Sequence, residues 1–214
     1  MKRRNTRGFS LIEMAMVLAI AMIMMSITFI SLQPALRDIH NNQAYDLVMM
    51  QLRNARARAI SDREQYIVCF GVTLCTGGAQ PMGAPTAQSI QIYEWPAGTA
   101  LTSSVQVSNV SLPQDIDFQV LTGVPTGATP DGFGNASAAL DFDQGVAGGI
   151  TTQVMFMPDG SAHDTNGNLN SGVLYIGRTG DLYSSRAVTL FASSGRLRGW
   201  RLVNNSGVAT WIQQ

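Results

Sequence analysis

The chain of 214 residues has a hydrophobic content of 45%, which excludes an intrinsically disordered protein and fits one or two globular domains. Charged residues make up only 13%, and the formal net charge of +0 gives no indication of a nucleic-acid or membrane partner. The charges are nevertheless unevenly placed. Residues 1–8 carry four basic residues and no acidic one, residues 65–177 carry eight acidic residues and no basic one, and residues 178–214 carry five arginines and only Asp181.

The first predicted element is a membrane helix over residues 9–34. Residues 9–32 form a run of 24 residues with one charge, followed by Gln33 and Pro34. At ~1.5 Å per residue this run spans about 36 Å, enough to cross a hydrocarbon core of ~30 Å. A cleaved secretory signal is the alternative, but its apolar region is usually only about 7–15 residues long. The basic residues before the run predict a cytoplasmic amino terminus and an extracytoplasmic head.

Glu13 is the single charge in this run. A carboxylate costs up to ~2.5–3.5 kcal/mol at the centre of a membrane helix, so it needs a partner or a function. The alternative is that Glu13 has no specific partner, lies near the membrane interface and extends its side chain toward the lipid headgroups.

The run Gly8-Phe9-Ser10-Leu11-Ile12-Glu13, with a basic leader before it and an apolar helix after it, resembles the processing site of type IV prepilins and of the pseudopilins of type II secretion. The resemblance implies that a prepilin peptidase cleaves after Gly8, that Phe9 becomes the N-methylated amino terminus, and that Glu13 serves filament assembly. In a helix, Phe9 and Glu13 are neighbours at i and i+4, so the new amine of the same or an adjacent subunit can accompany the carboxylate. Loss of the leader, residues 1–8, leaves 10 basic and 14 acidic side chains, a net charge of −4.

The helical pattern continues over residues 35–64 as an amphipathic helix. Apolar residues recur there at steps of three and four, at Ala44, Leu47, Val48, Leu52, Ala55 and Ala59. Arg53, Arg56 and Arg63 follow one flank, which we interpret as a solvated face rather than an anion site. Pro34 is expected to bend or locally break the helix, because it removes a backbone donor and clashes with the preceding turn.

Residues 65–214 predict a β-rich head with antiparallel sheets, so the fold class is α+β, with a long amino-terminal helix packed on the head. Short β-branched or alternating runs are separated by Gly-, Pro- and Asn-rich loops at 76–87, 122–136 and 158–172. The predicted strands are Tyr66–Phe70, Ser89–Trp95, Ser104–Val107, Ile116–Leu121, Ala138–Phe142, Gln153–Met157, Val173–Ile176, Ala187–Ala192, Leu197–Val203 and Val208–Ile212.

Four later segments resemble the GspH/FimT family of minor pseudopilins: residues 52–60, 67–70, 154–160 and 194–196. The resemblance implies a pilin-like fold and a structural subunit of a filament. It also implies a single-pass protein of the bacterial inner membrane, with a periplasmic head and a place near the filament tip. The implied partners are a prepilin peptidase, other pilin or pseudopilin subunits and the inner-membrane assembly platform.

The segment Gly195-Arg196-Leu197-Arg198 is similar to the Gly-Arg-x-Arg pattern of DNA-uptake minor pilins. In a strand, Arg196, Arg198 and Trp200 point to one side, where they can pair with phosphates and stack on a base, and Arg201 adds charge nearby. The alternatives are that these arginines solvate the surface, protect a sheet edge, or pair with an acidic neighbouring subunit.

The two cysteines, Cys69 and Cys75, predict a disulfide in an extracytoplasmic head, the alternative being a buried Cys69 and a free Cys75. The spacing fits no zinc site. Residues 164–170 alternate oxygen-bearing side chains as a calcium loop does, but the glycine is misplaced and the twelfth position is Tyr175, so we expect a polar turn and no metal.

The sequence predicts no enzyme and no cofactor. Its only lysine is Lys2, which excludes a phosphate-binding loop, and neither His40 nor His163 belongs to a metal motif. Ser161, His163 and Asp164 are expected to be too close in sequence to converge as a triad. The pairs Asp115/Asp117 and Asp141/Asp143 have no neighbours that indicate acid–base chemistry.

Two functions therefore fit the sequence. In the first, the protein primes or caps a type II secretion pseudopilus that drives protein secretion, with an exported protein as a further partner. The alternative is a FimT-like minor pilin of a type IV pilus, active in pilus biogenesis and in DNA binding and uptake. The sequence does not decide between these systems, nor between a position at the tip and one along the shaft.

Overall fold

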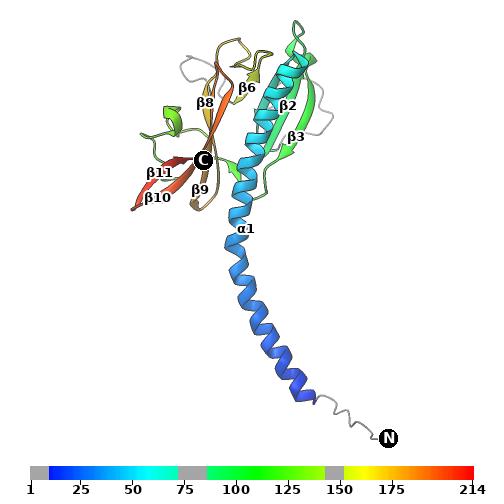
Figure 1. Cartoon of the computed structure of the whole chain (residues 1–214), viewed down its shortest axis with the longest axis vertical. Helices are drawn as coiled ribbons and strands as arrows, with labels where there is room; N and C mark the ends of the chain where they lie inside the picture. The colour runs from blue at the N-terminus through cyan, green and yellow to red at the C-terminus, as the bar shows by residue number, and fades with distance from the viewer. Residues whose placement is uncertain (1–9, 72–85, 143–151) are drawn as a thin grey trace, which may run out of the picture. The chain divides into compact units, whose positions relative to one another are not determined.

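The computed structural model describes residues 10–71, 86–142 and 152–214 (Figure 1). A single long helix, α1, precedes a series of strands, and each pairing between strands in the described residues is antiparallel. The predicted α+β class, with an amino-terminal helix followed by antiparallel sheets, is confirmed. The elements are α1 (Leu11–Asp62), β1 (Gln65–Phe70), β2 (Ser89–Trp95), β3 (Val105–Ser111), β4 (Asp117–Phe118), β5 (Leu140–Phe142), β6 (Gln153–Phe156), β7 (Ala162–His163), β8 (Gly172–Arg178), β9 (Asp181–Phe191), β10 (Arg196–Asn205) and β11 (Val208–Gln213), with short 3-10 turns at Leu101–Ser103 and Pro130–Gly132.

Helix α1 contains 52 residues and is helical through Pro34, so the predicted local break at that residue is wrong. One proline removes one backbone donor, and the intact turns on either side hold the remaining hydrogen bonds of the helix. The helix begins where the carbonyl of Ser10 accepts hydrogen bonds from the backbone N–H groups of Glu13 and Met14. It ends at Asp62, because the next residue, Arg63, has a left-handed φ of 58°.

The contacts divide the chain into two compact units, one that ends at Ile39 and one that comprises His40–Gln214, which we call the head. In the first unit, the large apolar side chains from Leu11 to Met25 are exposed. No helical stretch among the described residues combines the length and apolar character that a membrane crossing requires. The predicted membrane helix 9–34 includes Phe9 and the side chains of residues 27–34, which lie outside the described part of the structure, and it stays a prediction.

The head contains two sheets (Figure 1). The first has five strands in the order β3-β2-β1-β6-β7, and the second has the order β11-β10-β9-β8-β4, with β5 also paired to β8. The buried face of α1 consists of Ala44, Val48, Leu52, Ala55 and Ala59, each 0% exposed, as the amphipathic pattern predicts. These residues share one core with β1, β2, β6, β8 and β9.

Most predicted strands exist, with shifted ends. Strand β2 has the predicted bounds, whereas β9 begins six residues before the predicted Ala187, at Asp181. Its first half contains Ser184, Ser185 and Arg186, buried polar residues that do not look like a strand in sequence. Strand β7 lies inside the predicted loop 158–172, and β4 shrinks to two residues, because such short pairings carry no periodic signal.

Candidate functional site

The predicted processing site lies at the start of α1. Gly8 and Phe9 lie outside the described residues, so their roles stay predictions. Glu13 is exposed in the first turn of α1, where the unpaired N–H groups of the helix favour a negative charge. Its predicted role in filament assembly stays a prediction.

Of the residues predicted to form a binding patch on β10, some are exposed and others contact the head itself. Arg196 and Arg201 are exposed. Arg198 donates from Nη1 to Asp131 Oδ1 at 2.6 Å, and its guanidinium lies 4.9 Å from the centre of the Phe191 ring. Trp200 is half-buried and donates from Nε1 to Thr189 Oγ1 at 3.2 Å. Arg198 and Trp200 thus contact the head itself, which the strand pattern alone does not reveal.

A second arginine, Arg56 of α1, contacts the turn that leads into β10. Its Nε donates to the carbonyl of Gly160 at 3.0 Å and its Nη2 to the carbonyl of Ser194 at 2.9 Å. The prediction that Arg56 belongs to a solvated face is therefore wrong. Gly195, with φ of 60°, permits this contact, because a Cβ there would overlap the Gly160 carbonyl and the Arg56 side chain.

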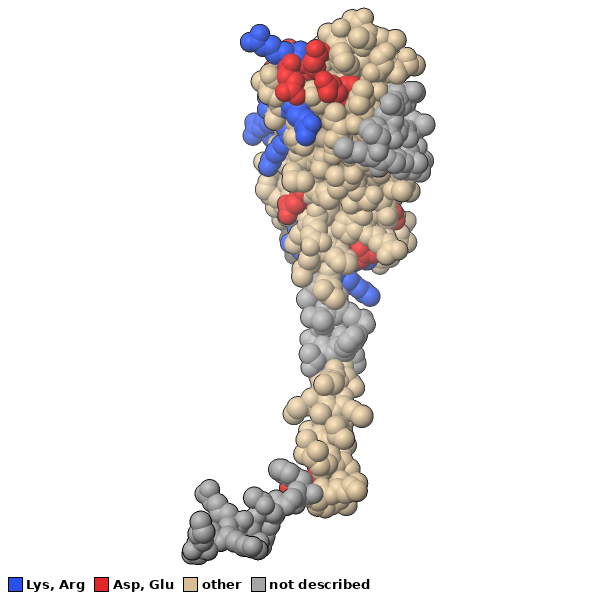
Figure 2. Space-filling model, turned by 90° about the vertical axis from the view of Figure 1, so that its right-hand side faces the viewer, with Lys and Arg blue, Asp and Glu red and all other residues tan. Residues whose placement is uncertain are grey.

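Charged side chains gather toward one end of the head on the face that Figure 2 shows. Arginines and acidic residues lie next to one another there, and much of the remaining described surface on that face is uncharged.

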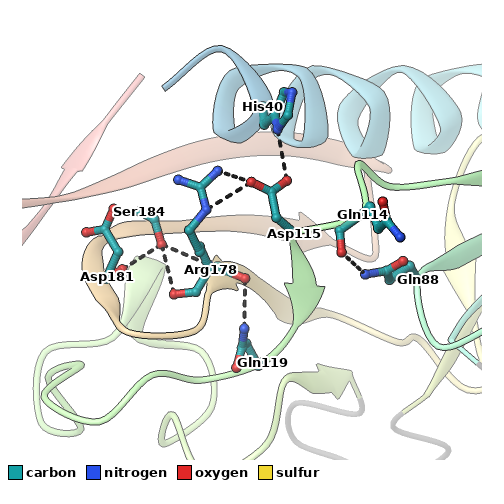
Figure 3. Close-up of polar contacts among 9 residues, drawn as sticks. His40, Gln88, Gln114, Asp115, Gln119, Arg178, Asp181 and Ser184 are labelled. Atoms are coloured by element: carbon teal, nitrogen blue, oxygen red, sulfur yellow. Dashed lines mark hydrogen bonds and ion pairs between the residues drawn. The ribbon is translucent and has the colours of Figure 1, made fainter. Parts of the chain in front are cut away.

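A polar network joins α1, at the first residue of the head, to the segment before β4 and to the end of β8 (Figure 3). The Nδ1 of His40 lies 3.0 Å from Asp115 Oδ1, and Arg178 donates to Asp115 Oδ2 from Nε at 3.0 Å and also from Nη2. These residues come from α1, the segment before β4 and the end of β8. Burial alone would raise the pKa of the Asp115 carboxyl, but hydrogen bonds from Arg178 and His40 hold that pKa below its ordinary value.

Hydrogen bonds in the same region support the hairpin turn that joins β8 to β9. The backbone N–H of Arg178 donates to Ser184 Oγ at 2.8 Å, and the Ser184 hydroxyl donates to the carbonyl of Asp181 at 2.6 Å (Figure 3). Gln119 reaches the same turn by donating from Nε2 to the carbonyl of Gly177 at 2.9 Å. Sequence reasoning assigned no role to Asp115, because its partners lie 63 and 75 residues away in the chain.

Ser161 and His163, which we expect to be too close in sequence to form a catalytic triad with Asp164, do contact each other. His163 Nε2 is 2.9 Å from Ser161 Oγ, two residues earlier in the chain. The serine hydroxyl also lies 2.5 Å from Asp159 Oδ1, while His163 Nδ1 faces the carbonyl of Gly167 at 2.9 Å. The carboxylate therefore contacts the serine rather than the imidazole, which is not the order of a catalytic triad.

Asp164 organises the polar turn that the sequence predicts over residues 164–170. Its Oδ1 accepts the backbone N–H groups of Asn166 and Asn168 at 2.9 and 2.8 Å. These bonds lower the pKa of the Asp164 carboxyl, although its burial acts in the opposite direction. Within the described residues, no group of three or more His, Cys, Asp or Glu side chains is arranged to hold a metal ion.

Cys69 lies on β1 and is fully buried. It takes part in a disulfide. Cys75, its predicted partner, lies outside the described residues.

The family model described as the prokaryotic N-terminal methylation motif matches residues 3–29. The amino-terminal segment thus carries a prokaryotic methylation motif. A crystal structure of the type IV minor pilin FimU of Pseudomonas aeruginosa is similar to this chain, with 13% identity, a TM-score of 0.39, and coverage of 79% of this chain and 91% of that one. Comparison with curated protein sequences finds no match.

Proposed function

We propose that the protein is a GspH/FimT-type minor pseudopilin, a structural subunit that primes or caps a type II secretion pseudopilus. The match of the methylation motif to residues 3–29 carries this proposal. In it, a prepilin peptidase removes residues 1–8 and N-methylates Phe9. Residues 9–34 anchor the chain in the inner membrane, and the head lies in the periplasm near the filament tip.

The exposed carboxylate of Glu13 supports the assembly step. A carboxylate at this depth of an apolar helix is stabilised when a cation lies beside it, and the amine of Phe9 on an adjacent subunit supplies one. The other subunits and the inner-membrane assembly platform are the partners, and an exported protein contacts the completed tip.

Replacement of Glu13 tests this proposal. We expect Glu13→Gln to be cleaved like the wild type but to be absent from sheared filaments, because the neutral side chain cannot pair with the amine. Asp38→Asn, an exposed acidic residue of the same helix, is the matched control. Normal incorporation of Glu13→Gln, measured by immunoblot of filament and membrane fractions, would contradict the assembly role.

The alternative function is a type IV pilus subunit that binds DNA, and the exposed Arg196 and Arg201 of β10 favour it. If it holds, the full chain in detergent shifts duplex DNA at low salt. Arg196→Ala with Arg201→Ala then weakens the shift and lowers the slope of log affinity against log salt by about 2. Absence of any shift at low salt would leave the secretion function.

A further inference from the structure

A pocket of about 400 Å³ lies between the second half of α1 and the turn that joins β9 to β10. Three arginines line it, Arg53 and Arg56 from the helix and Arg196 from the first position of β10. Apolar side chains, chiefly Ile60 and Leu197, line the remainder. The pocket thus combines three positive charges with an apolar wall, although its residues lie up to 144 positions apart in sequence.

The fold holds one of these arginines in place. The two hydrogen bonds from Arg56 to the carbonyls of Gly160 and Ser194 fix its guanidinium against two turns. A guanidinium has five N–H groups, so three donors of Arg56 remain for another acceptor. A donor group held in advance loses less conformational entropy when it binds a ligand.

The structure shows no acidic side chain paired with the arginines of this pocket in the part of the head that it describes. Among the described residues, Arg53, Arg56 and Arg196 form no ion pair, whereas Arg178 and Arg198 are each paired with an aspartate. Like charges around one concavity repel one another, and such a cleft concentrates the field that attracts an anion. An anionic group in the pocket would therefore relieve an unfavourable arrangement.

We propose that this pocket binds a side-chain carboxylate on an acidic segment of a neighbouring filament subunit. The proposal rests on the proposed function as a filament subunit. Arginine forks match the planar geometry of a carboxylate, and Ile60, which is 45% exposed, offers contact to an apolar residue beside it. The partner segment therefore carries an apolar residue beside its acidic one.

A protein carboxylate fits the pocket better than the phosphates of DNA. Tight sequence-independent DNA binding uses ~6–10 phosphate contacts along an extended surface, and this pocket offers three cations at one point. After loss of the leader, the net charge of −4 repels a long polyanion but not a single carboxylate that enters a local positive field.

The test uses the full chain purified in detergent and a fluorescent peptide of alternating Glu and Leu. We expect saturable binding by fluorescence anisotropy, and no binding of the matched peptide of alternating Gln and Leu. Arg53→Ala with Arg196→Ala should weaken binding at least about tenfold, as expected for the loss of charge-assisted hydrogen bonds. Arg201→Ala, an exposed arginine of β10 outside the pocket, should change the affinity less than about twofold.

Three outcomes would overturn the proposal: no binding of the Glu peptide, an equal loss in Arg201→Ala, or duplex DNA that displaces the peptide and depends on the same arginines. Unfolding temperatures of the variants exclude a loss caused by misfolding. Cleavage after Gly8 is measured separately. Normal cleavage without peptide binding would therefore reject the pocket and leave the filament function intact.

Discussion

Asp131 decides the role of Arg198. Its side chain is 7% exposed, and it accepts hydrogen bonds from Arg198 Nη1 at 2.6 Å and from Thr189 Oγ1 at 2.5 Å. A buried carboxylate with a cationic partner is stable only while that partner remains. Arg198 therefore holds the loop around Asp131 against β9 and β10, whereas Arg196, two residues before it, stays available to a ligand.

Removal of Arg198 should destabilise the head. We expect Arg198→Ala to lower the free energy of unfolding by about 3 kcal/mol, because Asp131 is left buried without its cation. Arg196→Ala, the matched exposed control, should change it by less than about 0.5 kcal/mol. Chemical denaturation measures both. Equal effects of the two substitutions would contradict a structural role specific to Arg198.

Protonation of Asp115 should make the head less stable in acid. Its pKa is lowered in the folded state, so its contribution is complete above the unfolded value of ~3.9 and is lost as the pH falls through the folded pKa. We expect the unfolding temperature of the wild type to fall below about pH 4 more steeply than that of Asp115→Asn. Asp46→Asn, the control at an exposed residue of α1, should keep the wild-type dependence of unfolding temperature on pH. If Asp115→Asn also keeps it, the network of Asp115 with Arg178 and His40 does not cause the loss of stability in acid.

Among the elements, the buried face of α1 could be predicted from sequence. Its apolar residues recur at the helical spacing, which indicates the side chains that face the core. Leu52 and Ala55 follow that period and are 0% exposed. The first half of β9 could not be predicted, since Ser184 and Arg186 are polar yet buried. Ser184 and Arg186 donate hydrogen bonds to main-chain carbonyls, and the alternation of apolar and polar residues that predicts a strand does not reveal these bonds.

The helix face is tested by two substitutions of similar size on opposite sides of α1. Leu52→Ala should cost about 2–5 kcal/mol of unfolding free energy, because it opens a cavity between the helix and the sheets. Met50→Ala, which is 57% exposed, should cost less than about 0.5 kcal/mol. Urea denaturation compares them, and a larger effect at Met50 would contradict the packing of α1 on the head.

In the whole molecule, the net charge of zero is the sum of the charges of regions that differ in sign. Four basic residues lie in the predicted leader, and their loss leaves a net charge of −4. The candidate pocket could not be predicted, because Arg53 and Arg196 belong to elements that only the fold brings together. The Gly-Arg-x-Arg pattern likewise does not reveal that Asp131, 67 residues earlier, engages one of its arginines.

The central claim is that residues 1–8 are a leader that a prepilin peptidase removes. The most direct test is the intact mass and amino-terminal sequence of the chain produced in cells with an active prepilin peptidase, with Gly8→Val as the uncleaved control. The account predicts a protein of residues 9–214 that begins at Phe9 and carries one added methyl group. A chain that retains residues 1–8, or one cleaved after the apolar run near residue 35, would contradict it.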